Sequence, residues 1–384
     1  MNNSRRTAAF VFARWLATRD YPANLLPDGE SRAFVQDLVY TAIRRFRPLG
    51  SVLRKLVKKW PKGEMEALLY IGAAQILYMD DVPDFAAVNE TVEAAKECSN
   101  PSVAKTVNAV LRNIIRRRAE FEDFLAGAPV EERESMPSGV YRRWLARFGE
   151  TNAAKLAAWH NRPAETYLAY PDGRYEKLAR GCRVGDVEGF NEGSFIVQDP
   201  ATALAVGLLD VKPAERVLDA CAAPGGKTIQ LAWRSASVTA CEVNPRRRRK
   251  LLANLERTGL LDKVEILESL DVEGLTFDKI LVDAPCSNTG VFRRKPDARW
   301  NWSEEKLASL AALQSEILEK AAKLLKPGGL LVYSTCSNEP EENDKRIEDF
   351  LSRHKEYTLV EKRESLPFET DYDGAFAAAL KKTL

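Results

Sequence analysis

The chain has 384 residues, of which 45% are hydrophobic and 29% charged, and its 57 basic and 55 acidic residues give a net charge of +2. This length predicts two or three domains at about 150 residues each, and the composition excludes a disordered, collagen-like or disulfide-scaffold chain. The longest strongly apolar stretch without a charge, residues 67–79, is too short for a bilayer span of about 20 residues. Because Arg14 interrupts the N-terminal apolar run, we expect no secretory signal and a cytoplasmic protein.

The cysteine and histidine counts restrict the chemistry. Six cysteines without regular spacing or a CxxC pair are typical of thiols in a reducing compartment, not of a disulfide framework or a zinc site. Only two histidines are present, His160 and His354, which nearly excludes a histidine triad or a histidine-rich metal centre. We therefore expect a mechanism without a metal.

Apolar residues recur at helical spacing from about residue 4 to 120, which predicts an all-helical domain over 1–125. Basic clusters at 44–47, 54–59 and 112–118 have Phe46 and Trp60 among them. Two interpretations stay open, solvated helix faces or a surface that contacts nucleic-acid phosphates. Residues 126–190 mix helical and turn-rich segments and are predicted to be a connector and an N-terminal extension of the following domain.

From residue 191 onward the pattern becomes that of an α/β domain. Short apolar runs alternate with helix-length segments, which predicts a doubly wound parallel sheet over 191–384, and the tail predicts a final antiparallel strand pair. Ligands of such sheets bind at the carboxyl ends of the strands. We therefore expect the chemistry where the predicted strands end, at residues 219–221, 242, 271, 283–286 and 334–336.

The segment at residues 219–228, DACAAPGGKT, directly follows a predicted strand and opens a predicted helix. Small residues there let a nucleotide-like ligand approach the backbone N–H groups. Gly226-Lys227-Thr228 also matches the end of a Walker A loop, with Asp283 ending a Walker B-like strand, so a P-loop NTPase is a rival. Cys221 at the first Walker glycine position and Pro224, which lacks an N–H, disfavour that rival. A nicotinamide GxGxxG fingerprint is absent.

Acidic residues follow the second and third predicted strands. Glu242 lies 23 residues after Asp219, where an acidic side chain binds the hydroxyls of a ribose; the alternative is an exposed loop carboxylate. A ribose site without a pyrophosphate site indicates S-adenosylmethionine. Glu268 and Asp271 follow the third strand, and either can accept a hydrogen bond from the adenine amino group; we favour Asp271.

Two cysteines, Cys286 and Cys336, each follow a predicted buried strand. A single cysteine in such a place is most simply a small buried apolar residue, but two at one sheet edge beside a nucleotide loop favour catalysis. C5 of cytosine becomes nucleophilic only after a group adds to C6, and a thiolate is suited to that reversible addition. The pair therefore indicates covalent catalysis.

Three segments, DACAAPGGKT, DAPCSNTG and YSTCSNEPEEN, together resemble the RNA cytosine-5 methyltransferases of the Nop2/Sun class. LLYIGAAQILYMDDVP, AAVNETVEAAK and TVNAVLRNI are similar to the NusB-type RNA-binding domain of the bacterial Sun/Fmu (RsmB-like) subgroup. The resemblance implies a Rossmann-like class I methyltransferase domain, an all-helical NusB-like N-terminal domain, and the 16S RNA of the small ribosomal subunit as substrate. Residues 169–171, Ala-Tyr-Pro, depart from the Arg-Val-Asn triplet common in the family.

The same resemblance implies residue roles. Cys336 is implied to be the nucleophile, and Cys286 is implied to assist release of the methylated base. Asp283 is implied to face the cofactor or the cytosine edge, and Asp271 is expected to contact adenine. The other residues implied to hold S-adenosylmethionine are Cys221, Ala222, Ala223, Pro224, Gly225, Gly226, Lys227 and Glu242. We expect a monomer with no DNA or membrane partner. Two alternatives stay open, the same reaction on another RNA such as tRNA, and a non-enzymatic RNA-binding or assembly factor.

Overall fold

A computed structural model describes residues 3–29, 31–98, 101–179, 181–234 and 237–383. The chain forms two compact units: a helical unit of Met1–Arg162 with Phe292–Asn301, and a sheet unit of Pro163–Val291 with Trp302–Leu384. The chain therefore leaves the sheet unit after Val291 and returns to it at Trp302. The domain boundaries at 125 and 190 remain predictions.

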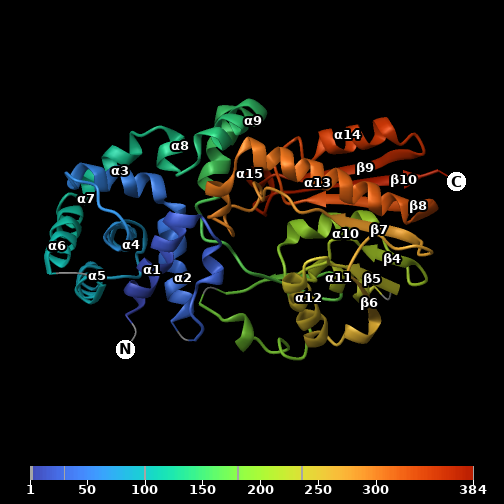
Figure 1. Ribbon diagram of the computed structural model, residues 1–384, viewed down its shortest axis with the longest axis horizontal. Helices are drawn as coiled ribbons and strands as arrows, with labels where there is room; N and C mark the ends of the chain where they lie inside the picture. Colours follow the sequence, from blue (N-terminus) through green and yellow to red (C-terminus); the bar gives the residue numbers. More distant parts are fainter. Residues whose placement is uncertain (1–2, 30, 99–100, 180, 235–236, 384) are drawn as a thin grey trace. The chain divides into compact units, whose positions relative to one another are not determined.

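The helical unit contains α-helices and short 3-10 turns, in agreement with the helical periodicity of the N-terminal sequence (Figure 1). Among the residues that the structure describes, no helix is both long and apolar enough to cross a membrane. The elements of this unit are α1 (Ser4–Thr18), η1 (Pro22–Asn24), α2 (Arg32–Arg44), α3 (Phe46–Leu56), α4 (Glu64–Tyr78), α5 (Asp84–Cys98), α6 (Pro101–Arg116), α7 (Arg118–Ala126), α8 (Val130–Arg133), α9 (Ser138–Trp159) and η5 (Ala298–Asn301).

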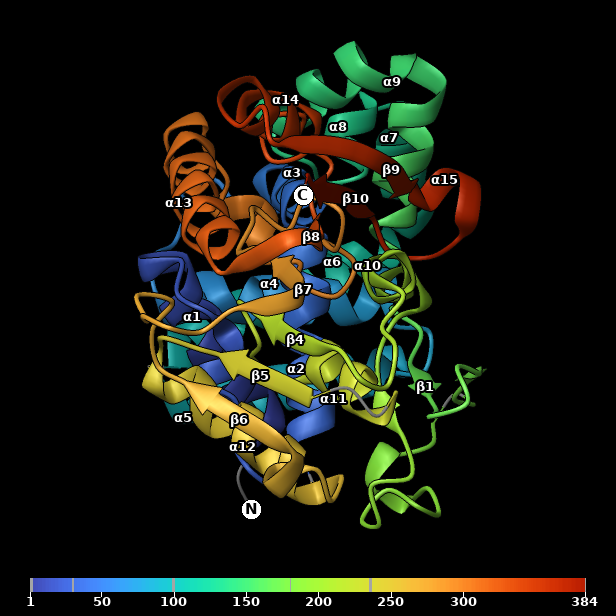
Figure 2. The same ribbon diagram turned by 90° about the vertical axis from the view of Figure 1, so that its right-hand side faces the viewer.

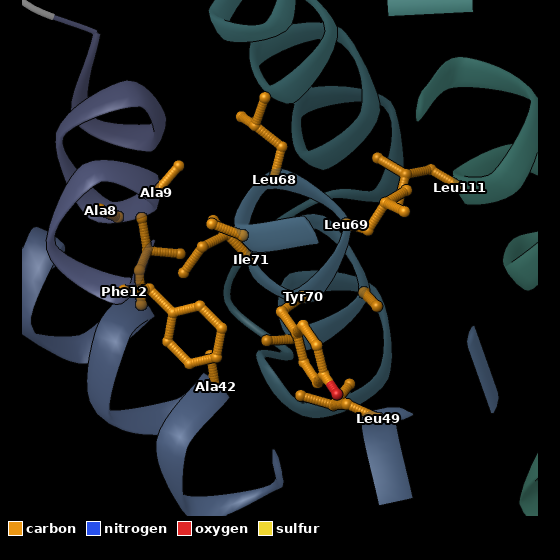
Figure 3. Packing of buried hydrophobic residues seen from close by; sticks show 14 of the residues in the cluster. Ala8, Ala9, Phe12, Ala42, Leu49, Leu68, Leu69, Tyr70, Ile71 and Leu111 are labelled. Carbon is orange, nitrogen blue, oxygen red and sulfur yellow. The ribbon is translucent and has the colours of Figure 1, made fainter. Parts of the chain in front are cut away.

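Helix α4 is the centre of this unit's core because it is buried on every side from Ala67 to Ile76. Figure 3 shows the apolar side chains gathered around it, and the rings of Phe12 and Tyr70 lie 5.3 Å apart there. A Cβ at Gly72 would lie 2.6 Å from Leu111 of α6. The glycine thus permits close packing of α4 against α6.

The sheet unit is built on seven strands, which lie side by side in the order β6-β5-β4-β7-β8-β10-β9 (Figure 2). The first five run parallel, and β10 pairs antiparallel with both β8 and β9. This confirms the doubly wound sheet and the final antiparallel pair. The strands are β4 (Arg216–Asp219), β5 (Ser237–Cys241), β6 (Val264–Leu267), β7 (Phe277–Asp283), β8 (Leu325–Thr335), β9 (Tyr357–Ser365) and β10 (Ala375–Lys382).

Helices cover both faces of this sheet. One apolar cluster joins the sheet to α10, α11 and α12, and a second joins it to α13 and α14. A separate small sheet has the order β2-β1-β3. The helices and remaining strands of the unit are β1 (Tyr167–Ala169), β2 (Tyr175–Lys177), η2 (Val184–Asp186), β3 (Ile196–Val197), η3 (Pro200–Thr202), α10 (Ala203–Leu209), α11 (Gly226–Trp233), α12 (Pro245–Arg257), η4 (Leu261–Lys263), α13 (Glu304–Lys323), α14 (Asp344–Arg353) and α15 (Pro367–Thr370).

Candidate active site

The parallel pairing of β7 with β8 brings the two predicted cysteines together. Asp283, the last residue of β7, pairs with Ser334 of β8, so the segments that follow both strands begin at the same edge of the sheet. The Sγ atoms of Cys286 and Cys336 lie 3.2 Å apart. The Sγ atom of Cys336 is also 3.4 Å from Oδ1 of Asn288. Neither Cys286 nor Cys336 forms a disulfide bond, and both are intermediate in exposure, so this edge presents a pair of thiols in direct contact.

The surroundings of Cys286 disfavour its ionised form. The contact with Cys336 raises the pKa of the Cys286 thiol well above its ordinary value, and burial and the nearby carboxylate of Glu342 raise it further. Cys286 is therefore a neutral thiol near pH 7. A neutral thiol can exchange a proton with its neighbour but is a weak nucleophile itself.

An ion pair lies beside the thiols. Nζ of Lys227 donates to Oδ2 of Asp283 at 2.7 Å, and Oγ of Ser334 donates to Oδ1 at 2.8 Å. Burial lowers the pKa of Lys227, but the charge of Asp283 and the hydrogen bond to it raise it more, so the pKa stays above its ordinary value. The lysine thus remains charged and holds the carboxylate in place at the end of β7.

The segment between β4 and α11 lies close to other parts of the unit at its two glycines. Gly225 has a φ of +110°, and a Cβ there would lie 3.0 Å from Leu251 of α12. A Cβ at Gly226 would lie 3.1 Å from the amide of Gln198. Asn254 and Arg247, both of α12, donate to the carbonyl oxygens of Pro224 and Ala223 respectively, at 2.8 and 2.9 Å. The loop is therefore held against α12.

Asp219 anchors the start of this loop. Its carboxylate accepts hydrogen bonds from Thr228 Oγ1 at 2.7 Å and from the backbone N–H of Cys221 at 3.4 Å. Burial raises the pKa of Asp219 to about 6. Burial also raises the pKa of the Cys221 thiol. Asp219 is thus a structural group beneath the loop, and Cys221 is a neutral thiol within it.

Glu242 follows β5 and is only 3% exposed, so the alternative of an exposed loop carboxylate is wrong. Its Oε1 accepts a hydrogen bond from Asn244 N at 2.9 Å. Its Oε2 is buried and has no hydrogen-bond partner in the described part of the chain, with Nη1 of Arg247 3.4 Å away. A buried acceptor without a donor costs free energy, so this oxygen is suited to a ligand hydroxyl.

The two acidic residues after β6 lie at the surface. Asp271 is 68% exposed at its side chain and pairs with Lys320 at 2.9 Å, and that hydrogen bond lowers the pKa of Asp271. Glu268 is 72% exposed and pairs with Arg248 at 2.9 Å. Both carboxylates already have cationic partners, so the choice between them as the adenine acceptor remains a prediction.

The structure separates the basic clusters of the helical unit into two groups. Phe46 stacks on Tyr70 at 5.0 Å in the core, and burial lowers the pKa of Arg44 to about 10. Arg47 binds Glu132 and the carbonyl of Met136. These residues are therefore structural. The exposed basic residues that remain in these clusters are Arg54, Lys55, Lys58, Lys59, Arg112 and Arg116.

Glu342 belongs to this site, although the sequence did not single it out. Its side chain is fully buried and accepts hydrogen bonds from residues that directly follow the two cysteines, Ser287 and Ser337. The available signal was that Glu342 lies in the same YSTCSNEPEEN segment, residues 333–343, as Cys336. The described residues contain no group of three or more His, Cys, Asp or Glu side chains arranged to hold a metal ion.

The sheet order, the glycine-containing loop before α11 and the buried Glu242 define a class I methyltransferase fold, here on a chain that also carries a helical unit. Residues 206–381 match the family model "16S rRNA methyltransferase RsmB/F", and residues 2–116 match the NusB family. The chain is 34% identical to ribosomal RNA small subunit methyltransferase B of Vibrio vulnificus and 33% identical to that of Serratia proteamaculans, covering 99% of this chain and of each relative.

Solved structures agree in fold. The crystal structure of PH0851 matches 99% of this chain and 98% of its own with a TM-score of 0.80 at 23% identity, which shows a common fold. A methyltransferase homolog from Pyrococcus horikoshii matches 66% of this chain and 97% of its own, with a TM-score of 0.59 and 26% identity. The chain belongs to the RsmB/F family of 16S rRNA methyltransferases.

Membership of this family makes the chain an S-adenosylmethionine-dependent rRNA methyltransferase. The Rossmann-like fold and the NusB-like helical domain that the resemblance implied are confirmed. The P-loop NTPase and the non-enzymatic assembly factor, both weighed from the sequence, are therefore excluded.

Proposed function

We propose that this chain methylates C5 of a cytosine in 16S rRNA through a covalent bond between Cys336 and C6 of the base. The observation that carries the proposal is the 3.2 Å contact between the Sγ atoms of Cys286 and Cys336 beside the Asp283–Lys227 ion pair. Methylation of a nitrogen or a ribose oxygen needs no thiol. Methylation of C5 needs a nucleophile on C6, and a thiolate is suited to that addition.

The steps follow from these groups. The thiolate of Cys336 forms a bond to C6, which makes C5 nucleophilic, and S-adenosylmethionine supplies the methyl group to C5. The C5 proton then leaves, the C6–S bond breaks, and its electron pair returns to Cys336. We assign Cys286 to this release step: after its thiol has given its proton to solvent, the thiolate takes the proton from C5, and the C5–H electron pair forms the C5–C6 double bond. A thiol of raised pKa becomes a strong base when it ionises.

Asp283 is proposed to select cytosine over uracil. The 4-amino group of cytosine is a hydrogen-bond donor, and the Asp283 carboxylate is an acceptor held in place by Lys227 and Ser334. Uracil presents an acceptor oxygen at that position, which a carboxylate repels. The same ion pair keeps a carboxylate charge next to the thiols while the base is bound.

The cofactor is proposed to bind on the loop from Cys221 to Lys227 and on Glu242. Oε2 of Glu242, which has no hydrogen-bond partner among the described residues and lies 3.4 Å from Arg247, fits a ribose hydroxyl. The first turn of α11, which begins at Gly226, offers backbone N–H groups to the carboxylate of the methionine part. Val243, which is 66% exposed directly after Glu242, offers an apolar surface to the adenine. Asp271 is proposed to accept a hydrogen bond from the adenine amino group.

The RNA is proposed to contact a basic face of α12 in addition to the exposed basic residues of the helical unit. Arg246, Arg249 and Lys250 are exposed, and their i, i+3, i+4 spacing places them on one side of the helix. Leu251 and Leu255 face the core. The first turns of a helix favour acidic residues, because the N-terminal end of the helix dipole is positive. Three cations in the first two turns of α12 are therefore unfavourable for the helix, and phosphate binding offers a reason for their presence.

The proposal is tested by bisulfite sequencing and nucleoside mass spectrometry of 16S rRNA from cells that lack this chain. We expect one cytosine to lose its 5-methyl group and to regain it when the wild-type chain is restored. Restoration with Cys336→Ala is the matched control and should fail. Loss of a ribose or exocyclic-amine methyl group, with every 5-methylcytosine retained, would reject C5 methylation.

A further inference from the structure

The buried carboxylate of Glu342 joins the two segments that carry the cysteines. Glu342 lies in the loop that connects β8 to α14, and its side chain is fully buried. Oε1 accepts hydrogen bonds from the backbone N–H of Ser287 at 2.8 Å and from Nε2 of Gln314 at 2.9 Å. Oε2 accepts from Oγ of Ser287 at 2.5 Å and from Oγ of Ser337. Ser287 directly follows Cys286, and Ser337 directly follows Cys336.

The pairing of β7 with β8 ends before it reaches Ser287 and Ser337. The register of β7 with β8 ends at Asp283 and Ser334, and the backbone N–H of Ala284 still donates to the Ser334 carbonyl at 2.9 Å. Beyond that bond the hydroxyls of Ser287 and Ser337 lie 3.1 Å apart and share Oε2 of Glu342. Past the end of the strands, Glu342 therefore joins the residues that directly follow the two cysteines, in addition to the bonds from Gly290 N to the Cys336 carbonyl at 3.0 Å and from Asn338 N to Thr289 Oγ1 at 2.8 Å.

We propose that Glu342 is a positioning residue that holds the Cys286 and Cys336 segments in register, so that the two thiols stay in contact during catalysis. Burying a carboxylate is costly, and apolar packing would join two loops at lower cost. Four hydrogen-bond donors, the N–H groups of Ser287 and Gln314 and the hydroxyls of Ser287 and Ser337, offset that cost, and their directional bonds define the geometry of both segments as apolar contacts do not. The inference rests on the proposed function for its effect on turnover, but the contact between thiols is measurable without RNA.

The key variant is Glu342→Gln, which keeps the shape and one acceptor oxygen. The Ser287 and Ser337 hydroxyls can rotate to accept from the new amide, so we expect the chain to fold. The charge-assisted bonds to both hydroxyls are lost. We expect kcat to fall about 10- to 100-fold, with KM for the RNA and Kd for S-adenosylmethionine within about twofold of wild type.

Phenylarsine oxide, which bridges two adjacent thiols, measures the thiol pair directly in the full-length protein without RNA. Wild type should capture the reagent, Cys336→Ser should not, and Glu342→Gln should capture it at least about 10-fold more slowly. Glu341→Gln is the matched control, since Glu341 is the neighbouring residue and pairs with Lys345 at the surface. It should leave capture and kcat unchanged. Ser287→Ala and Ser337→Ala provide milder versions if Glu342→Gln does not fold.

The outcomes separate the inference from the proposed function. Slow capture together with a lowered kcat supports the inference. Wild-type capture with Glu342→Gln overturns it, whether kcat falls or not, because the thiol pair would then not depend on the carboxylate. If Cys336→Ala retains activity while Glu342→Gln slows capture, the covalent mechanism fails but the positioning of the two segments stands.

Discussion

The thiols of Cys286 and Cys336 are 50 positions apart in the chain, and their Sγ atoms are 3.2 Å apart in space. Their contact is a direct result of the parallel register that aligns Asp283 with Ser334. The contact with Cys336 raises the pKa of the Cys286 thiol well above its ordinary value. Cys286 therefore holds its proton near pH 7.

Single substitutions of the two cysteines should give opposite results on a denaturing gel. Cys336→Ala removes the nucleophile, so turnover and any protein–RNA adduct should be undetectable although RNA still binds. Cys286→Ala should allow attack and methylation but slow release, so a slowly migrating adduct should accumulate with RNA and S-adenosylmethionine. The reverse pattern would exchange the two roles, and full activity in both variants would reject covalent catalysis.

Removal of the Glu242 carboxylate should weaken cofactor binding. Glu242→Ala deletes the buried oxygen proposed to accept from the ribose, and a hydrogen bond to a charged group accounts for an affinity change of about 10- to 100-fold. Calorimetry with S-adenosylmethionine measures this loss. Asp271→Ala should weaken binding by less, and Glu268→Ala should not change it; the reverse order would assign adenine to Glu268. An unchanged Kd in Glu242→Ala would remove the ribose site from this residue.

Neutralisation of the basic face of α12 should weaken RNA binding without affecting the cofactor. The variant that combines Arg246→Ala, Arg249→Ala and Lys250→Ala should lose three phosphate contacts to single-stranded RNA. The slope of log affinity against log salt concentration should therefore become less steep by about 2. Filter binding at several salt concentrations gives this slope. The control combines Lys212→Ala, Lys326→Ala and Lys381→Ala, which remove the same charge at the opposite edge of the sheet. Equal effects of the two sets would indicate a general charge effect and no specific surface.

Arg299 should stabilise the helical unit. It is fully buried, and its guanidinium donates to the carbonyls of Ser135 and His160 at 3.3 and 3.1 Å and to Asn161 Oδ1 at 3.0 Å. Arg299→Ala leaves three buried acceptors without this donor, so we expect a loss of about 2–4 kcal/mol in the free energy of unfolding. Urea unfolding followed by helical circular dichroism measures it. A loss below about 0.5 kcal/mol would show that the pocket relaxes around the substitution.

Asp219 should make stability depend on pH. Its folded-state pKa of about 6 lies above the ordinary value of 3.8, so the folded state binds a proton more tightly than the unfolded state does. Stability should therefore fall as the pH rises from about 4 to 6 and then level off, with a total change of ~1–3 kcal/mol. Asp219→Asn should remove this component, which paired denaturation curves at pH 4 and pH 7 would detect. An equal pH dependence in the two proteins would contradict the raised pKa.

The sequence alone was enough to predict the alternation of strands and helices after residue 191, the helical N-terminal part, and the edge at which Cys286, Cys336, Asp283 and Lys227 meet. Each of these depends on local patterns. Periodicity of 2 or 3.6 identifies the element, and the carboxyl ends of parallel strands share one edge whatever the details of packing. The burial of Glu242 was consistent with its position directly after a strand.

Other features were decided only by tertiary structure. Phe46 stands in a basic cluster in the sequence, but it packs on Tyr70. The segment Phe292–Asn301 lies between two elements of the sheet unit in the chain, yet Arg299 and Trp300 bind Ser135 and Ile43 of the helical unit. Glu342 binds Ser287, 55 positions earlier in the chain. Such contacts join residues far apart in sequence, and local periodicity carries no information about which distant donor a buried carboxylate will meet.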